Sequence, residues 1–498
     1  MALIQITDLT FTYPGSFDPV FEHVSFQLDT DWRLGLTGRN GRGKTTLLRL
    51  LQGQYPHQGT ITAPGGFEYF PYPIPDAALT PLALLECSFP DVPQWRLRRE
   101  LAPLFVTDDA LYRPFSTLSG GEQAKILLAL LFAREGRYLL IDEPTNHLDE
   151  TGRALVSRYL AKKSGFLLVS HDRAFLDGCV DHILSINRGG IEVQKGNFSS
   201  WYENRQRQDA FELAQNAQLK KEIGRLKQAA RQSRAWADKV ENTKIGPHSA
   251  KVTGEADAMG GRAYIGEQSR RMQQRRKNLE RRQNAAIEEK SALLKNIEQA
   301  APLKLHQLPY HTDRLALLRD VSVCYGGAPV CRGVSFCVEQ GDRIALRSAN
   351  GTGKTSLLRL LCGEDVPHTG TVERSSRLRI SYVRQDPSGL RGDLGAYAAR
   401  YGLDESLFKA ILRKLDFARV QFEKDMADFS AGQKKKVLLA RSLCEPSHLL
   451  VWDEPLNYVD VLSRMQIEDL LLEFQPTIVF VEHDRVFCDH VATKAVML

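Results

Sequence analysis

A loop motif rich in glycine and ending in lysine occurs twice in this chain, about 310 residues apart. The copies read GRNGRGKTT at 38–46 and SANGTGKTS at 348–356. Each is followed by LSGGEQ or FSAGQK, then by an apolar segment ending in Asp-Glu, then by an apolar segment leading to a histidine. Four motifs repeated in one order predict two domains of the same fold. The equivalent residues are Lys44 and Lys354, Glu143 and Glu454, and His171 and His483.

Length and composition restrict the class of protein. A chain of 498 residues is too long for one hydrophobic core and suits two or three domains. No apolar run approaches the roughly 18 residues of a membrane-spanning helix, and the first residues lack the layout of a signal peptide. The eight cysteines form no CxxC pair, which favours a reducing compartment over disulfides or a zinc site. We therefore expect a cytoplasmic protein without a membrane partner.

Residues 1–196 and 311–498 are predicted as two α/β domains, because apolar segments rich in β-formers alternate with helical stretches. This alternation is typical of a mostly parallel sheet. The predicted strands lie at 33–37, 138–141, 166–169, 343–346, 449–452 and 478–481.

Residues 197–310 have the pattern of a helical hairpin that joins the two domains. Glycines and a proline interrupt the pattern near 241–266, which predicts an irregular tip. With about 35 residues per arm and roughly 1.5 Å of rise per residue, the hairpin would extend on the order of 50 Å. The apolar seam of the first arm is Leu219, Ile223, Leu226 and Ala230, and that of the second is Met272, Leu279, Ala286 and Leu293.

Positive charge is concentrated in this predicted hairpin. Residues 197–304 contain 22 Lys and Arg against 13 Asp and Glu, a surplus of nine positive charges. Because the whole chain has a net charge of +6, the remainder sums to −3. A polyanionic partner explains this asymmetry, and a solvated helical face is the alternative.

The two loop motifs predict phosphate binding. Their glycines let backbone N–H groups point at phosphate oxygens where a helix begins, and the lysine places a positive charge at the β- and γ-phosphates. The threonine after the lysine offers a hydroxyl to Mg²⁺. A tyrosine about thirty residues before the lysine of each loop is a candidate for stacking on adenine, with a core aromatic as the alternative. The predicted nucleotide contacts are Tyr13, Gly38, Asn40, Gly41, Gly43, Lys44, Thr45 and Thr46 in the first copy and Tyr325, Asn350, Gly351, Gly353, Lys354, Thr355 and Ser356 in the second.

An acidic pair ends a predicted strand in each copy. The first carboxylate is placed to hold Mg²⁺ and the second to polarise the attacking water, while the histidine after the next strand is placed to contact the γ-phosphate. Because phosphoryl transfer needs mainly positioned groups and neutralised charge, the combination predicts an ATPase that uses ATP and Mg²⁺. The candidate catalytic residues are Glu143, His171, Glu454 and His483, and the candidate metal ligands are Thr45, Asp142, Thr355 and Asp453.

Across both terminal domains these motifs resemble the ATP-binding cassette (ABC) superfamily, of which LSGGEQ is the specific mark. In that superfamily the signature of one cassette covers the nucleotide held by the other, so that ATP closes the pair like a clamp. The resemblance implies two composite sites, and we expect a monomer whose own cassettes pair. The signature residues would be Ser430 and Gly432 at the first site and Ser119, Gly120 and Gly121 at the second.

Several positions depart from the superfamily pattern. Ser348 replaces the first loop glycine, and Phe429 and Ala431 alter the second signature. Aligning FEYFPYP with ISYVRQDP places Tyr72 where the second copy has Gln385, the usual metal-contacting glutamine of the superfamily. An uncharged phenol is a poorer Mg²⁺ ligand than an amide oxygen, so we expect slower hydrolysis at the first site.

Three classes of ATP-driven protein compete. A transporter needs membrane domains, which this sequence lacks, and a DNA-acting cassette protein is expected to carry zinc-binding cysteine pairs or far longer coiled coils. Tandem cassettes joined by a basic hairpin instead resemble the ABC-F subfamily, and GNFSSWYENR at 196–205 is similar to its linker entry. The resemblance implies binding at the ribosomal tRNA exit site while closed on ATP. The hairpin would then reach the P-site tRNA and the large-subunit rRNA of the peptidyl-transferase centre.

Within that subfamily, DEPLNYVD at 453–460, FSAGQKKK at 429–436 and KIG at 244–246 resemble the Lsa/Vga-type antibiotic-resistance group. Housekeeping translation factors usually carry DEPTN in both copies, and here only the first copy does. The resemblance implies protection of ribosomes from lincosamides, pleuromutilins and streptogramin A, with a housekeeping role as the alternative. The candidate RNA contacts of the tip are Lys244, Lys251, Arg262 and Tyr264.

Overall fold

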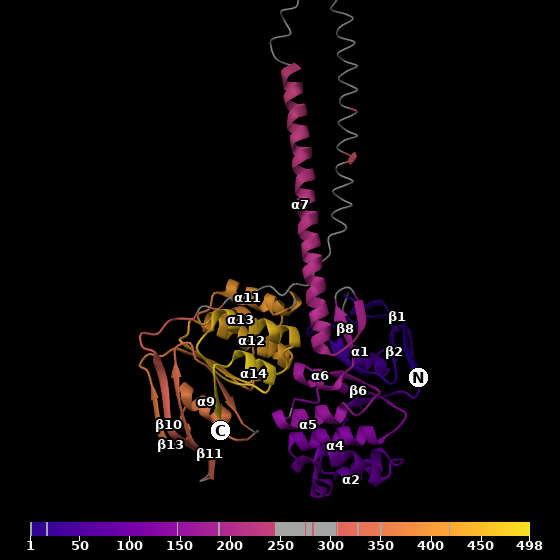
Figure 1. Cartoon of the computed structure of the whole chain (residues 1–498), viewed down its shortest axis with the longest axis vertical. Coiled ribbons are helices and arrows are strands. Elements are labelled where there is room, and N and C mark those ends of the chain that lie inside the picture. The colour runs from indigo at the N-terminus through magenta and orange to yellow at the C-terminus, as the bar shows by residue number, and fades with distance from the viewer. Residues whose placement is uncertain are drawn as a thin grey trace, which may run out of the picture. The chain divides into compact units, whose positions relative to one another are not determined.

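The computed structural model describes residues 2–15, 18–146, 148–187, 190–244, 274, 281–282, 305, 307–325, 328–348, 351–417 and 419–498. The chain divides into two compact units, one of Met1–Trp201 with Ala300–Leu498 and the other of Tyr202–Gln299 (Figure 1). Both sequence repeats belong to the first unit. Outside the described residues lie Asn350, Lys251, Arg262, Tyr264, Met272, Leu279, Ala286 and Leu293, together with the side chains of Ala230 and Lys244.

Among the described residues, the first repeat is built around a six-stranded sheet of order β5-β6-β7-β3-β8-β9. Neighbouring strands are parallel except β8 and β9. The central strands are continuous apolar runs, because a parallel sheet is covered on both faces. The strands are β3 (Arg33–Thr37), β5 (Phe67–Phe70), β6 (Tyr138–Asp142), β7 (Phe166–Val169), β8 (His182–Asn187) and β9 (Gly190–Lys195).

The second repeat has an all-parallel sheet of order β14-β15-β16-β12-β17 in the part of the chain that the structure describes. Its strands are β12 (Arg343–Arg347), β14 (Ile380–Val383), β15 (Leu449–Asp453), β16 (Ile478–Val481) and β17 (Lys494–Met497). The six predicted strands agree with the structure to within one residue, and the predicted α/β fold class is confirmed.

Each repeat also contains a three-stranded antiparallel sheet with the same order of equivalent strands. In the second repeat this sheet lies at the opposite side of the repeat from helices α11 and α13 (Figure 1). The strands are β1 (Leu3–Phe11), β2 (Phe21–Asp29) and β4 (Gln58–Thr62) in the first repeat, and β10 (Arg314–Tyr325), β11 (Ala328–Glu339) and β13 (His368–Arg374) in the second.

Helices begin where the motifs end. The loop motifs run directly into α1 (Lys44–Leu51) and α9 (Lys354–Cys362), and the signature motifs into α4 (Gly120–Ala133) and α12 (Ala431–Cys444). A hydrophobic core fills the space between sheets and helices of each repeat. The other helices are α2 (Pro81–Ser88), α3 (Gln94–Leu101), α5 (Glu150–Leu160), α6 (Arg173–Cys179), α10 (Leu394–Arg400), α11 (Glu405–Lys414), α13 (Val461–Phe474) and α14 (Arg485–Val491).

The first arm of the predicted hairpin is the continuous helix α7 (Phe198–Lys244) (Figure 1). Its 47 residues correspond to roughly 70 Å at 1.5 Å per residue. The helix is anchored at its start, where Phe198 and Trp201 are buried with ring centroids 5.5 Å apart and the Ser199 amide donates to Asp177 over 2.8 Å. Farther along, Ile223 of the predicted seam is buried.

None of the helices among the described residues combines the length and the apolar composition needed to cross a bilayer.

Candidate functional site

The two loop motifs have nearly the same backbone. Gly43 and Gly353, which precede α1 and α9, adopt φ of 92° and 83°, a left-handed conformation that side chains rarely accept. The next residue in each copy is a buried lysine. Lys44 Nζ donates to the Gly38 carbonyl over 2.7 Å, and Lys354 Nζ to the Ser348 carbonyl over 3.0 Å. Burial lowers the pKa of both amines, although the neighbouring carboxylates oppose it. A helix N-terminus with this cation is suited to binding phosphate.

The candidate catalytic glutamates follow the last residues of β6 and β15. Glu143 and Glu454 have φ of 50° and 46°, so both copies hold a bulky residue in the left-handed region. In each copy the histidine Nε2 approaches the glutamate Oε1, at 3.2 Å for His171 and 3.3 Å for His483. The structure therefore brings the predicted glutamate and histidine together in both copies. Only the His483–Glu454 pair has hydrogen-bond geometry, and Glu143 Oε1 has no hydrogen-bond partner among the described residues.

The two glutamates nevertheless have different surroundings. Burial, reinforced by the charge of Asp142, raises the pKa of Glu143 to about 8. Burial also favours the neutral form of Glu454, but hydrogen bonds from His483 and Gln385 outweigh it and lower the pKa of this carboxyl. Gln385 Nε2 donates to Glu454 Oε2 over 2.8 Å, and Asn457 Nδ2 donates to the same oxygen over 2.6 Å.

The first copy replaces this amide by two tyrosines with separate contacts. The ring of Tyr72, which aligns with Gln385, packs against Phe89 at 5.0 Å between centroids. The hydroxyl that reaches the acidic pair belongs instead to Tyr69, which donates to Asp142 Oδ2 over 2.9 Å. Tyr69 was missed by the sequence analysis because its equivalent, Tyr382, carries no motif.

The acidic residues before the glutamates have the donor set of a magnesium site. Asp453 is completely buried beside Thr355, and neither carboxylate oxygen has a hydrogen-bond partner of normal geometry among the described residues. Burial raises the pKa of Asp453 to about 6 and, less strongly, that of Asp142, which lies beside Thr45. Carboxylate and hydroxyl oxygens are ligands that Mg²⁺ prefers, so these residues fit the predicted ion.

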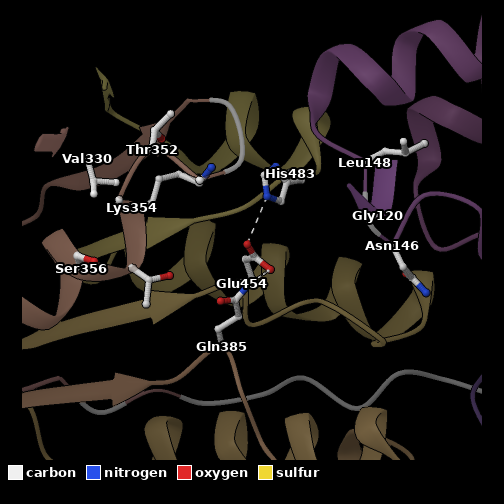
Figure 2. Close-up of a pocket in the computed structure, with 13 residues that line it drawn as sticks. Gly120, Asn146, Leu148, Val330, Thr352, Lys354, Ser356, Gln385, Glu454 and His483 are labelled. Carbon is white, nitrogen blue, oxygen red and sulfur yellow. Dashed lines mark hydrogen bonds and ion pairs between the residues drawn. The ribbon is translucent and has the colours of Figure 1, made fainter. Parts of the chain in front are cut away.

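A cavity of about 510 Å³ surrounds the second loop motif (Figure 2). Gly120 of the first signature forms part of its wall, opposite Lys354 and His483. Four predicted residues do not line this cavity: Ser119, Gly121, Tyr325 and Asp453. The predicted residues that line it are Gly120, Gly351, Gly353, Lys354, Thr355, Ser356, Gln385, Glu454 and His483, and the sequence analysis missed Asn146, Leu148, Val330 and Thr352.

A cavity of about 250 Å³ lies at the first loop motif and is lined by both repeats. Asn40 Nδ2 donates to the carbonyl of Tyr458 over 3.0 Å, and a Cβ on Gly432 would lie 2.5 Å from that same carbonyl. The predicted residues that line the cavity are Asn40, Gly41, Glu143, His171, Ser430 and Gly432. The lining residues that were not predicted are Asp416, Phe417, Gln421, Gln433, Lys436 and Tyr458. The predicted residues that do not line this cavity are Tyr13, Gly38, Gly43, Lys44, Thr45, Thr46 and Asp142.

The two signatures differ in sequence but share a helix cap. Ser119 and Ser430 each accept from the backbone amide three residues on, at 3.2 and 3.3 Å, and the side chain of that residue caps the serine amide in return. Phe429 takes the buried place of Leu118 and packs on Phe417.

The candidate adenine-stacking tyrosines are both hydrogen-bonded to their loop helix. Tyr13 Oη lies 2.7 Å from Thr46 Oγ1, and Tyr325 Oη lies 3.0 Å from Ser356 Oγ. Both rings remain partly exposed, so each keeps a surface available beside the loop.

Known proteins with similar sequences cover both repeats of the chain. The ABC transporter family matches residues 21–68 and 331–457. The ribosome protection protein VmlR of Bacillus subtilis is 26% identical over 99% of this chain and 87% of its own length. The ATP-binding protein Uup of Caulobacter vibrioides is 28% identical over 96% of this chain and 75% of its own. The chain is an ABC-F type ATP-binding protein with two cassettes.

Other relatives extend the comparison. The probable ATP-binding protein YbiT of Escherichia coli O157:H7 is 25% identical over 96% of this chain and 92% of its own length. The solved structure named RNase-L Inhibitor matches with a TM-score of 0.59 at 19% identity, covering 99% of this chain and 87% of that one. At that identity the likeness shows the shared fold. As an ABC-F protein, the chain binds ATP and is an ATPase.

Proposed function

We propose that this ABC-F ATPase binds the ribosome at the tRNA exit site when closed on ATP, and that it protects the peptidyl-transferase centre from lincosamides, pleuromutilins and streptogramin A. The observation that carries the proposal is that residues of both repeats line each nucleotide cavity. This observation supports a clamp formed by the two repeats of one chain, without a second ATPase subunit.

The predicted site residues would divide the work of hydrolysis at each cavity. Lys354 and the loop amides would hold the phosphates, and Glu454, fixed by His483 and Asn457, would accept a proton from the attacking water. Mg²⁺, held by Thr355, Asp453 and Gln385 or by Thr45 and Asp142, would neutralise charge on the β- and γ-phosphates.

Closure of the two repeats would bring the signature of one repeat against the phosphate-binding loop of the other. The contact between Asn40 and the Tyr458 carbonyl joins the two repeats, and Gly432 leaves no space for a side chain there. Because ATP would add its phosphates between these surfaces, binding favours the closed form and hydrolysis releases it.

Two observations support ribosome binding: the positive charge of the linker and the similarity of the chain to VmlR. Residues 197–304 carry a surplus of nine positive charges, which favours contact with the phosphate backbone of structured RNA. VmlR, a ribosome protection protein, is similar to almost the whole chain. We propose that residues 241–266 form the part of the linker that approaches the peptidyl-transferase centre and the P-site tRNA, in a cytoplasmic monomer.

Ribosome binding is tested by a variant that carries both Glu143→Gln and Glu454→Gln. Without either water-polarising carboxylate, ATP should hold the clamp closed, and the variant should co-sediment with ribosomes in ATP but not in ADP. Glu373→Gln, an exposed change of the same chemistry on β13, is the matched control and should behave as wild type. A folded, nucleotide-binding double variant that stays in the supernatant would refute ribosome binding.

Protection is tested separately by expressing the wild-type chain in a drug-sensitive bacterial host. Inhibitory concentrations of at least one of the three drug classes should rise, and the Glu143→Gln plus Glu454→Gln variant should not raise them. Ribosome binding with unchanged inhibitory concentrations for all three classes would instead assign the chain to housekeeping translation factors.

A further inference from the structure

A hollow of about 860 Å³ lies entirely in the second repeat, next to the ATP cavity, with which it shares Thr355 and Gln385. Residues of β14, α9, α10 and α12 line it. Four of these residues are arginines: Arg359, Arg384, Arg400 and Arg441. Three are tyrosines: Tyr382, Tyr397 and Tyr401. We call this hollow the Arg/Tyr groove.

Flat cationic and aromatic groups lie against one another in the Arg/Tyr groove. The Arg441 guanidinium carbon is 4.8 Å from the centre of the Tyr401 ring, and that of Arg400 is 6.0 Å from the same ring. On another wall the Arg384 guanidinium carbon lies 5.8 Å from the Tyr382 ring. Phenol and guanidinium planes are the surfaces on which nucleobases stack.

The charge of the groove is positive by one, with four arginines against three carboxylates. Glu364 accepts from both Arg359 and Arg384, at 2.6 and 3.1 Å, so one carboxylate serves two cations. Asp386 is engaged by Ser388, and Glu445 lies 3.6 Å from Arg441. Arg400 makes no ion pair with any described residue, and the Arg384 side chain is 69% exposed. These two guanidiniums are available to an incoming phosphate.

A buried hydrogen-bond donor also lines the Arg/Tyr groove. Tyr397 is only 8% exposed, and its hydroxyl, which lies beside the Arg441 guanidinium, donates to no acceptor among the described residues. Buried polar groups are seldom left in this condition, because an unsatisfied donor destabilises the fold. A ligand with an acceptor oxygen or ring nitrogen would satisfy it.

The first repeat has tyrosines at the equivalent place, Tyr69 and Tyr72, but lacks the cluster of arginines. Its corresponding hollow is about 400 Å³ and is lined by one arginine, Arg49, which already donates to the Tyr55 hydroxyl over 2.9 Å. Pro71 and Pro73 occupy part of the wall. Since both repeats carry the same ATPase motifs, the Arg/Tyr groove is not a requirement of ATP hydrolysis.

We propose that the Arg/Tyr groove binds an unpaired nucleotide. The base would stack on the Tyr401–Arg441 surface, the phosphate would contact Arg384 and Arg400, and the Tyr397 hydroxyl would donate to the base or sugar. Both a free nucleotide and an unpaired nucleotide of an RNA strand present this chemistry. The inference goes beyond the proposed function, because it requires neither closure on ATP nor binding to a ribosome.

The test measures fluorescence anisotropy of a labelled single-stranded hexaribonucleotide on the full chain. Thr355 and Gln385 line both the Arg/Tyr groove and the ATP cavity. The ATP sites are therefore filled first with a non-hydrolysable ATP analogue, and unbound analogue is removed so that it does not occupy the groove. Unlabelled AMP, CMP and duplex RNA are the competitors. Competition by AMP or CMP as strong as that by the unlabelled hexamer would identify a free nucleotide as the ligand, and much weaker competition would identify RNA.

Three variants remove the groups separately. Arg384→Ala with Arg400→Ala should weaken binding about tenfold or more and flatten its salt dependence. Tyr401→Leu should weaken it at least ~5-fold, as expected for one stacked base. Tyr397→Phe removes only the hydroxyl and should weaken binding several-fold. Arg332→Ala, on an exposed position of β11, is the matched control and should bind as wild type.

Binding of the ATP analogue and an unchanged melting temperature establish that each variant is folded. The proposal is overturned if no nucleotide or hexamer binds, if the groove variants bind as tightly as wild type, or if polyglutamate competes as well as RNA. Failure of ribosome co-sedimentation leaves the groove proposal standing, and loss of groove binding leaves ATP-dependent closure untouched, so the two proposals fail independently.

Discussion

Glu143 and Glu454 occupy equivalent positions in the two repeats, but their neighbours shift the pKa values of their carboxyls in opposite directions. The motif alone predicted both positions, and their left-handed backbone and histidine partner are shared. The sequence did not predict that the pKa of one carboxyl is raised and that of the other lowered. That difference depends on Gln385 and Asn457, whose amides reach the glutamate only once the loops have folded.

Glu100 offers a residue-scale prediction about pH. It is 4% exposed, and it accepts from Tyr159 over 2.7 Å and pairs with Lys163. Burial opposes ionisation, but these partners outweigh it and lower the pKa of Glu100 below 4.5. A depressed pKa in the folded state contributes stability that is present above the unfolded pKa and is lost as pH falls through the folded value.

Glu100→Gln should therefore destabilise the fold at pH 7, by about 1–3 kcal/mol. The melting temperature would fall by a few degrees at pH 7. The difference from wild type would narrow as pH falls from about 4.5 through the lower folded-state pKa of Glu100, below which both proteins carry a neutral group. Glu135→Gln, which removes a mostly exposed partner of Arg96, is the control and should show almost no gap at either pH. An equal gap at pH 7 and pH 4 would contradict the assignment.

At the scale of elements, periodicity was sufficient for the strands and for the first linker arm. Continuous apolar runs bounded by motifs predicted six strands to within one residue, because buried parallel strands have no polar face. Periodicity did not predict the role of Tyr69, because an aromatic residue in a strand is expected to be part of the core. Its hydrogen bond to Asp142 is visible only in the folded structure. Helix α7 continues to Lys244, into the range 241–266 that was predicted as an irregular tip. Most of the rest of the tip and of the second arm falls outside the described residues and stays a prediction.

Helix α11 provides an element-scale prediction. The Asp404 carboxylate accepts from the amides of Ser406 and Leu407 over 2.8 and 3.1 Å, and so caps the helix whose Phe408 and Leu412 enter the core. Asp404→Ala should reduce stability by about 0.5–2 kcal/mol. Asp404→Asn keeps a side-chain oxygen that can accept these hydrogen bonds, and it should retain most of the stability. Thermal unfolding distinguishes the two, and equal loss in both variants would show that charge, not capping, is responsible.

The whole molecule is a pair of repeats with unequal contacts across their interface. His171–Asp172–Arg173 and His483–Asp484–Arg485 are identical in sequence. Arg173 pairs with Glu468 of the other repeat, and both side chains are less than 10% exposed. Arg485 approaches Glu150 at 3.8 Å, with 68% and 49% of the two side chains exposed. One side of the interface therefore holds a desolvated ion pair and the other a solvated one.

Glu468→Gln should consequently weaken pairing of the repeats far more than Glu150→Gln. Removing one partner of a buried pair costs about 3–5 kcal/mol, because it leaves Arg173 buried with an uncompensated charge. Removing one partner of an exposed pair costs about 0–1 kcal/mol. Hydrogen exchange of α6 and α14 in saturating ATP measures the difference: both helices should exchange faster in Glu468→Gln and at the wild-type rate in Glu150→Gln. Equal exchange in the two variants would mean that the buried pair does not hold the closed form, and closure would then depend on nucleotide contacts alone.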